Sequence, residues 1–413
     1  MHTFNTGVVL PETISVIPGD KSISHRAIII GALAKGSTTF HGFLMSQDCL
    51  HTLDIFKQLG VKIEQEGTTV TIYGKGAEGL QKPENALYVG NSGTGIRLIT
   101  GVLAGLPFNS QISGDASIQQ RPMDRVVNPL TTLGAQFDTH NGNPPLYVMG
   151  NPNLLPGLTY AMPVASAQVK SAMLLAGVTA GVPVTVIEPE PCRDHTERML
   201  QLFGAQVASE DGVISLNSWD LKAPSNKVQI PADISSALFF ICLALMTQQS
   251  VTFTNIGLNP SRIGCLTVLK SMGANIDIVP DTDAYEPMGD IIVNVANAPL
   301  TNITLSKDLV PNVIDELPIL AVLATACQGT FTVRDAKELR VKESDRIDGI
   351  CRLITALGGT IQELDDGFIL EGGCTPTNFN YNSHFDHRLA MSATIAAYAY
   401  GVSATVEGED SIA

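Results

Sequence analysis

The sequence predicts an α/β protein made of repeated units, because two alternating elements recur along the chain. The first is a helix with one apolar face that ends at a glycine and precedes two short strands. The second starts with polar or small residues, continues as an almost entirely apolar helix and ends in a β-branched strand. One repeat spans about 70 residues of mixed helices and strands, far more than a solenoid repeat.

The helices of the first element are expected to lie on the outside of each unit. A glycine directly after a helix permits the left-handed turn that ends it. These predicted helix ends stand at Gly60, Gly134, Gly204, Gly273 and Gly358. The alternating polar and apolar residues that follow each glycine predict a half-buried hairpin.

The helices of the second element are apolar nearly all round, so we expect each of them to be buried. Six occur, beginning within SHRAIIIGAL, SGTGIRLITG, SAQVKSAMLL, DISSALFFIC, DELPILAVLA and DHRLAMSATI. Each is followed by a short β-branched segment that predicts a strand.

The two halves of the chain resemble each other. PGDKSISHRA at Pro18 is echoed by PADISSALFF at Pro231, which predicts two similar domains of three repeats each. We expect the first domain at 19–230 and the second at 1–18 and 231–413. Because five glycine ends accompany six apolar helices, a sixth would fall near residue ~428. The last repeat is therefore expected to be degenerate, or the sequence to be a C-terminally shortened version of a longer one.

Composition excludes several classes of protein. The 413 residues are 44% hydrophobic and carry a net charge of −15, which argues against a general nucleic-acid binder or a binder of anionic membranes. The longest apolar run is about half the length of a membrane span, and no signal peptide is visible. The seven cysteines are scattered without a metal-binding pattern, so we expect reduced thiols, a cytoplasmic location and no metal.

The arginines of this acidic chain gather where helices begin. Arg26, Arg97 and Arg388 open apolar helices, whereas others lead into amphipathic ones: Arg121, Arg125, Arg193, Arg198, Arg340 and Arg346, with Lys342. Any single one could be a solvated side chain. Repetition makes these helix starts equivalent, however, and both helix N-termini and arginines bind phosphates and carboxylates. We therefore predict an electropositive cleft between the two domains for a ligand with several negative charges.

Acidic side chains beside these cations are the candidates for proton transfer. Asp315 precedes an apolar helix and could equally be its N-cap, and Glu343 could equally form a surface ion pair. A carboxylate pair tuned by neighbouring cations suits acid–base chemistry near neutral pH. Lys21, next to other cations, could also give or accept a proton.

Eight motifs in order resemble the 5-enolpyruvylshikimate-3-phosphate synthase family: PGDKSISHRA, GNSGTGIR, QQRPMDR, SAQVKSAMLLAG, RDHTERML, IDELPILA, LRVKESDRI and FDHRLAMS. The resemblance implies an inside-out α/β barrel of two domains, each with three βαβαββ units, the last one incomplete here. It implies transfer of the enolpyruvyl group of phosphoenolpyruvate to the 5-hydroxyl of shikimate 3-phosphate, with release of phosphate, in chorismate and aromatic amino acid biosynthesis. No cofactor or metal is implied.

The resemblance also implies roles for individual residues. Shikimate 3-phosphate would be bound by Lys21, Ser22, Arg26, Ser166, Gln168, Asp315 and Lys342, together with Arg193, at which family members vary. Phosphoenolpyruvate would be bound by Lys21, Gly93, Arg121, Gln168, Arg346 and Arg388. Asp315 would be the base and Glu343 the proton donor, with Lys21 as a third catalytic group. Gly93 would leave room for the herbicide glyphosate, so inhibition by glyphosate is expected.

Two alternatives stay open. UDP-N-acetylglucosamine enolpyruvyl transferases share the fold, but they have KNAAL in place of KSISHR and a reactive cysteine near the position of Ala116. A non-catalytic relative that binds shikimate 3-phosphate is the other, because family members usually continue beyond this chain end with a basic residue near phosphoenolpyruvate. We expect a monomer whose partners are these two small substrates, not nucleic acid or membrane.

Overall fold

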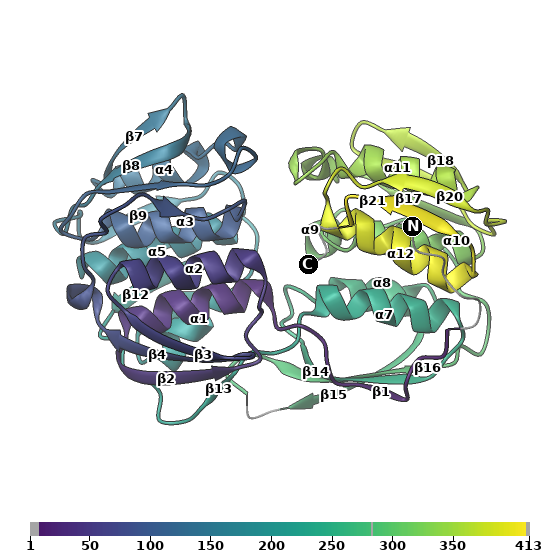
Figure 1. Ribbon diagram of the computed structural model, residues 1–413, viewed down its shortest axis with the longest axis horizontal. Helices are drawn as coiled ribbons and strands as arrows, with labels where there is room; N and C mark the ends of the chain where they lie inside the picture. Colours follow the sequence, from purple (N-terminus) through teal and green to yellow (C-terminus); the bar gives the residue numbers. More distant parts are fainter. Residues whose placement is uncertain (1–7, 282–283, 410–413) are drawn as a thin grey trace. The chain divides into compact units, whose positions relative to one another are not determined.

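The computed structural model describes residues 8–281 and 284–409, and it has the α/β fold that the sequence predicts (Figure 1). The chain forms two compact units. Unit 1 comprises Met1–Ile17, Ala232–Asp283 and Pro287–Ala413, and unit 2 comprises Pro18–Pro231 and Ala284–Glu286. Each unit has a hydrophobic core of its own.

Unit 2 contains three sheets of one plan, a parallel pair extended by two antiparallel strands, in the orders β13-β2-β4-β3, β5-β6-β8-β7 and β9-β10-β12-β11. Its strands are β2 (Lys35–His41), β3 (Lys62–Glu66), β4 (Thr69–Lys75), β5 (Leu87–Tyr88), β6 (Ser110–Ser113), β7 (Gln136–His140), β8 (Asn143–Met149), β9 (Leu158–Ala161), β10 (Val184–Ile187), β11 (Gln206–Glu210), β12 (Val213–Ser218) and β13 (Val228–Gln229). Its helices are α1 (Lys21–Leu33), α2 (Gln47–Gln58), α3 (Gly93–Ala104), α4 (Asp124–Thr132), α5 (Ala167–Ala180) and α6 (His195–Leu202), with short 3₁₀ turns at Ala77–Gly79 and Ile118–Gln120.

Unit 1 repeats the same plan in the sheet β1-β14-β16-β15. Its other strands form the antiparallel sheet β17-β19-β18 and the parallel pair β20-β21. The strands are β1 (Thr13–Ile14), β14 (Val251–Gly257), β15 (Asn275–Asp281), β16 (Met288–Asn294), β17 (Thr330–Val333), β18 (Thr360–Leu364), β19 (Gly367–Glu371), β20 (Phe379–Asn382) and β21 (Ala404–Glu407). The helices are α7 (Ile234–Met246), α8 (Gly264–Ser271), α9 (Val310–Val313), α10 (Leu317–Ala326), α11 (Arg346–Leu357) and α12 (His387–Tyr400), with a 3₁₀ turn at Lys337–Val341.

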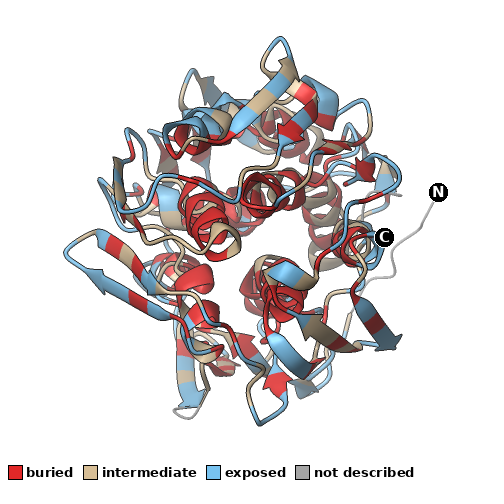
Figure 2. Cartoon of the chain, turned by 90° about the vertical axis from the view of Figure 1, so that its left-hand side faces the viewer, coloured by how far each residue is buried: buried red, intermediate tan, exposed pale blue. Residues whose placement is uncertain are grey.

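The six apolar helices are confirmed as buried elements: α1, α3, α5, α7, α10 and α12. Figure 2 shows long helices that are largely red and outer strands in which exposed residues alternate with buried ones. Close packing accompanies this burial. In unit 2, for example, a side chain at Gly101 of α3 would collide with the backbone of Ala172 in α5.

The predicted glycine helix ends are also confirmed. Gly60, Gly134, Gly204, Gly273 and Gly358 all have φ between 86° and 96°, the left-handed region in which a β-carbon is unfavourable. Each therefore ends its amphipathic helix in a left-handed turn, as predicted.

One alternative that the sequence leaves open is excluded. Asp315 does not cap the DELPILAVLA helix, because α10 starts at Leu317 and Glu316 takes the N-cap position without a side-chain capping bond. Asp315 lies in the short connection between α9 and α10, which leaves its carboxylate available for other partners. No helix in the part of the chain that the structure describes is long and apolar enough to cross a bilayer.

Candidate active site

The predicted site residues form two groups, one in each unit, and most of them stand in the first turn of a helix or in the segment before it. Lys21, Ser22, Arg26, Gly93, Arg121, Ser166, Gln168 and Arg193 belong to unit 2, and Asp315, Lys342, Glu343, Arg346 and Arg388 to unit 1. Each group is described by itself.

In unit 2, Arg26 of α1 is the most deeply buried cation of the predicted set, with 3% of its surface exposed. Its Nε donates to Thr196 Oγ1 at 2.6 Å, Nη2 to Ser171 Oγ at 2.8 Å and Nη1 to the Ser22 carbonyl at 2.9 Å. Burial lowers its pKa to about 10, against the opposing field of Glu197, so the side chain stays charged at neutral pH. A buried guanidinium held by neutral oxygens in this way is suited to an anionic ligand.

Lys21 and Ser22 lie at the start of the same helix, whose N-cap Asp20 accepts a hydrogen bond from the Ile23 amide at 2.9 Å. Lys21 forms an ion pair with Asp48 of α2, and its side chain is partly exposed. A partly exposed cation in the same helix turn as a buried one is a suitable arrangement for binding a phosphorylated substrate.

A second cluster surrounds Gly93, the first residue of α3. A β-carbon at Gly93 would lie 2.9 Å from Arg121 Nη1 and 3.3 Å from Arg97 Nη1. Arg97 Nη1 donates to Gln168 Oε1 of α5 at 2.7 Å, and Gln168 Nε2 donates to Thr94 Oγ1 at 3.2 Å. The structure thus brings Gly93, Arg121 and Gln168 together as predicted, and it adds Arg97, which the residue assignments omitted although its place at a helix start was noted.

The remaining predicted residues of unit 2 flank these clusters. Ser166 caps α5 by accepting from the Val169 amide at 3.4 Å. Arg193 is partly buried and close enough to Arg26 to lower the pKa of that guanidinium. Lys170 of α5 is buried and forms ion pairs with Glu188 at 2.9 Å and with Glu197 of α6 at 2.6 Å, which joins the two helices.

Among the described residues, Asp194, His195 and Glu286 form a group whose ligand atoms lie within 4.8 Å of one another, as a metal site would need. His195 Nδ1 and Glu286 Oε1 are hydrogen-bonded at 2.9 Å, and Arg198 Nε donates to Asp194 at 2.8 Å. An arginine on one of the acids disfavours a second cation there. The expectation that no metal is needed stays a prediction.

In unit 1, Arg346 is the centre of the predicted group and is 1% exposed. Its Nη2 donates to Glu343 Oε2 at 2.6 Å, its Nε to Asp386 Oδ2 at 2.8 Å and its Nη1 to Asp315 Oδ1 at 3.5 Å. Although burial opposes its charge, the three carboxylates raise its pKa above the ordinary value. Arg346 therefore holds both predicted proton-transfer groups in one place.

Two further cations complete this group. Lys342 Nζ lies 3.5 Å from Asp315 Oδ1. Arg388 Nη1 donates to the Asp315 carbonyl at 3.0 Å, and the Arg388 amide is capped by Asp386 Oδ1 at 3.0 Å. All five residues predicted for unit 1 therefore converge on Asp315 or on its partner Arg346.

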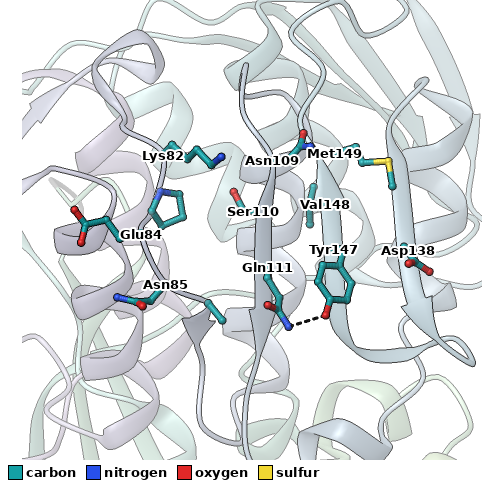
Figure 3. Close-up of a pocket in the computed structure, with 12 residues that line it drawn as sticks. Lys82, Glu84, Asn85, Asn109, Ser110, Gln111, Asp138, Tyr147, Val148 and Met149 are labelled. Carbon is teal, nitrogen blue, oxygen red and sulfur yellow. Dashed lines mark hydrogen bonds between the residues drawn. The ribbon is translucent and has the colours of Figure 1, made fainter.

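A separate groove of about 440 Å³ lies on unit 2 (Figure 3). It is lined by residues 82–86 and by residues of β6, β7 and β8, and Gln111 Nε2 donates to Tyr147 Oη across it at 3.2 Å. None of the predicted site residues lines this groove, and its surface includes no arginine.

A model of the family described as EPSP synthase (3-phosphoshikimate 1-carboxyvinyltransferase) matches residues 8–413. The chain belongs to the EPSP synthase family. A 3-phosphoshikimate 1-carboxyvinyltransferase of Shouchella clausii (strain KSM-K16) is 48% identical, over 92% of this chain and 89% of the relative. The one of Bacillus subtilis (strain 168) is 44% identical, over 96% of this chain and 92% of the relative.

A solved structure of EPSP synthase from Acinetobacter baumannii has the same α/β fold, with a TM-score of 0.88 and 40% sequence identity, and it is matched over 99% of this chain and 94% of its own. The family predicted from the eight motifs is therefore confirmed. EPSP synthases are enolpyruvyl transferases, and these comparisons favour that family over the UDP-N-acetylglucosamine enolpyruvyl transferases.

Proposed function

We propose that this chain transfers the enolpyruvyl group of phosphoenolpyruvate to the 5-hydroxyl of shikimate 3-phosphate and releases phosphate, in the synthesis of chorismate and aromatic amino acids. The observation that carries the proposal is the occurrence of arginines near the starts of helices in both units of a chain whose net charge is −15. Helix N-termini and guanidinium groups are the common protein ligands of phosphates and carboxylates, and the two substrates carry these groups.

The first group of residues supplies the binding of shikimate 3-phosphate. Arg26 presents a buried positive charge next to Ser22 and Lys21, which suits the ring hydroxyls and the phosphate. Ser166, Gln168 and Arg193 complete this set from α5 and from the segment before α6, and Lys342 and Asp315 are the contributions of unit 1.

Phosphoenolpyruvate needs cations for both its phosphate and its carboxylate. Arg121 and Gln168 stand beside Gly93, which leaves an approach to the backbone that a β-carbon would obstruct. Lys21 reaches the same substrate, and Arg346 and Arg388 are the arginines of unit 1 that we assign to it. Bidentate arginine contacts would hold the planar carboxylate in a fixed orientation.

The chemistry needs proton transfers in both of its steps and no redox step. In the addition, the 5-hydroxyl oxygen bonds to C2 of phosphoenolpyruvate as Asp315 takes the hydroxyl proton and Glu343 gives a proton to the methylene carbon. In the elimination, a proton of the new methyl group returns to the Glu343 carboxylate, the double bond to C2 forms again, and the C2–O bond to phosphate breaks. Lys21, the third catalytic group, would stabilise charge on the phosphate or carry a proton.

Arg346 supports this division of roles because it touches both carboxylates, at 3.5 Å for Asp315 and 2.6 Å for Glu343. A substrate anion bound at Arg346 would compete with Glu343 for the guanidinium. Binding of phosphoenolpyruvate at Arg346 would thereby free the Glu343 carboxyl group, which gives the proton to that substrate.

The finer architecture is part of the same proposal. We assign 19–230 to one domain and 1–18 with 231–413 to the other, arranged as an inside-out α/β barrel of βαβαββ repeats. The repeated sheet plan of unit 2 and of β1-β14-β16-β15 supports this assignment. A monomer in the cytoplasm, without a metal or other cofactor, stays the expectation.

The test is phosphate release from shikimate 3-phosphate and phosphoenolpyruvate, with either substrate omitted as a blank and UDP-N-acetylglucosamine as the competing acceptor. Asp315→Asn and Glu343→Gln should each lower kcat by about 10²–10⁴-fold, and Glu343→Gln should still bind shikimate 3-phosphate in calorimetry. Glu363→Gln, at an exposed carboxylate that pairs with Arg340, is the matched control and should retain activity. Binding without phosphate release would favour the non-catalytic relative, and release with UDP-N-acetylglucosamine instead would refute the proposed acceptor.

A further inference from the structure

Glu316 is a buried carboxylate next to the proposed base, and the mechanism above does not use it. It is 2% exposed. It stands at the N-cap position of α10 without capping that helix, and its Oε1 instead accepts a hydrogen bond from Ser235 Oγ of α7. A buried carboxylate is costly unless cations and hydrogen bonds compensate it, so its partners define what it does.

Two arginines are connected to Glu316, one through the Ser235 hydroxyl and one directly. Arg262 Nη2 donates to Ser235 Oγ at 2.8 Å and pairs with Asp233 Oδ1 at 3.1 Å. Arg388 Nη1 lies 3.8 Å from Glu316 Oε1. Glu316 is therefore connected to Arg262 through the Ser235 hydroxyl of α7, and it pairs with Arg388 directly.

The contact with Arg388 matters because that side chain also meets the proposed base. The same Nη1 donates to the Asp315 carbonyl at 3.0 Å. Arg388 is thus held by two adjacent residues: by the backbone carbonyl of Asp315 and by the carboxylate of Glu316. Without the charge of Glu316, the guanidinium loses one of these two attachments and can turn toward the Asp315 carboxylate, where it would be lost to substrate and would block the base.

The echo between the two halves of the chain supports this role. Asp20 and Asp233 both cap apolar helices, and Ser22 and Ser235 stand at the matching second position. Ser22 is assigned to substrate, whereas Ser235 donates to Glu316. In unit 1 the serine at this position binds the Glu316 carboxylate, whereas in unit 2 the matching serine is assigned to a substrate group.

We propose that Glu316 is a positioning residue: anchored by Ser235 and Arg262, it fixes the Arg388 guanidinium in the orientation that receives the phosphoenolpyruvate anion. It acts through Arg388 and touches no substrate. This inference rests on the proposed function for the identity of that anion. Glu316 is not among the residues assigned to either substrate, so this role is additional to those assignments.

The test is Glu316→Gln, which keeps the shape of the side chain and an acceptor for Ser235 but removes the charge. We expect kcat/KM for phosphoenolpyruvate to fall at least tenfold, while the Kd of shikimate 3-phosphate measured alone changes less than twofold. In Glu316→Ala, formate should restore kcat/KM at least threefold by refilling the carboxylate site, and neutral formamide should not. Formate should not raise the activity of the unsubstituted protein.

Glu188→Gln is the matched control, because Glu188 is also a buried carboxylate paired with a cation, Lys170, but lies in unit 2. It should lower thermal stability without a formate-dependent effect on phosphoenolpyruvate. If Glu316→Gln does not fold, Ser235→Ala serves instead. It leaves the charge in place but removes its anchor, and a threefold or larger rise in KM for phosphoenolpyruvate is expected.

Folded Glu316→Gln with phosphoenolpyruvate kinetics within twofold of the unsubstituted protein would overturn the inference. So would an equal loss for both substrates without formate rescue, because that pattern indicates a structural role only. If the unsubstituted protein releases no phosphate, the proposed function fails separately. Calorimetric binding of phosphoenolpyruvate then decides the inference, which is overturned if Glu316→Gln binds it equally well.

Discussion

Replacing Gly93 by alanine should weaken the use of phosphoenolpyruvate without weakening the fold. The new β-carbon would lie 2.9 Å from Arg121 Nη1 and 3.3 Å from Arg97 Nη1, where ordinary contacts begin at 3.4 Å. Both arginine atoms are ends of flexible side chains, so they can withdraw. The fold then remains intact, and only the positions of the two guanidinium groups change.

The size of the effect follows from these distances. Arg121 must retreat by about half an ångström, and misplacement of a binding group by 1 Å costs up to about 10²-fold in rate. We therefore expect KM for phosphoenolpyruvate to rise about tenfold, which corresponds to about 1.4 kcal/mol. Glyphosate, which is expected to crowd the same backbone, should inhibit Gly93→Ala more weakly than the unsubstituted protein.

Stability should change in the opposite direction or not at all. Gly93 is the first residue of α3 and is not among the residues with positive φ, so alanine can adopt its conformation. An alanine in place of a helical glycine stabilises by up to about 1 kcal/mol. The expected signature is therefore an unchanged or slightly raised Tm together with a raised KM.

Gly101→Ala, in the same helix, is the control of opposite sign. Its β-carbon would lie 2.7 Å from Ala172 Cα, a backbone atom that cannot withdraw, so this variant should lose stability. Phosphate release at varied phosphoenolpyruvate, glyphosate titration and thermal unfolding measure all three effects. An unchanged KM in folded Gly93→Ala would refute the reasoning, because the arginines would then not depend on the space that Gly93 leaves.

Three further outcomes concern His25, Lys170 and Arg97 of unit 2. Burial lowers the pKa of His25 to about 3 from 6.5, so the folded state holds it neutral. Stability is then lost as pH falls from 6.5 toward 3, by about 1.4 kcal/mol per unit, and urea unfolding of His25→Asn across that range should lack this part of the slope. Lys170→Met should destabilise by about 3–5 kcal/mol in chemical unfolding, because two buried carboxylates lose their shared cation; a further change of both glutamates to glutamine should restore most of it. Arg97→Met should raise KM for phosphoenolpyruvate with little change in Tm, because Gln168 loses the donor that orients it, and unaltered kinetics would count against that role.

The helices could be predicted from the sequence because their signals are local. An apolar segment such as that of α10 and a glycine such as Gly358 act within a few residues, and burial and positive φ follow from them directly. The alternative role of Asp315 as the N-cap of α10 does not hold, although an acid before an apolar helix resembles an N-cap, because the helix starts at Leu317. Asp315 instead meets Lys342 and Arg346, which are distant in sequence.

The supporting contacts of the site could not be predicted in this way. Ser235 and Glu316 are 81 residues apart, and Arg97 and Gln168 are 71 apart. Each of these pairs depends on how two buried helices pack. Periodicity shows that such helices are buried but does not fix which polar side chains meet between them. Motifs therefore indicate the residues that meet substrate, and packing decides the residues that orient them.

The partners of the two most buried site arginines differ in a way that fits a division of labour. Arg26 is held by hydroxyl groups and a carbonyl, so its charge is left for an incoming anion, and its surroundings contribute binding. Arg346 is held by three carboxylates, two of which are the proposed base and proton donor. Because these carboxylates already neutralise Arg346, it adds little net attraction for a substrate anion. It fixes the positions of the carboxylates instead, and an anion that binds Arg346 would weaken their ion pairs. The unit 2 group is thus suited to binding an anion, and the unit 1 group to fixing the acids that we propose for proton transfer.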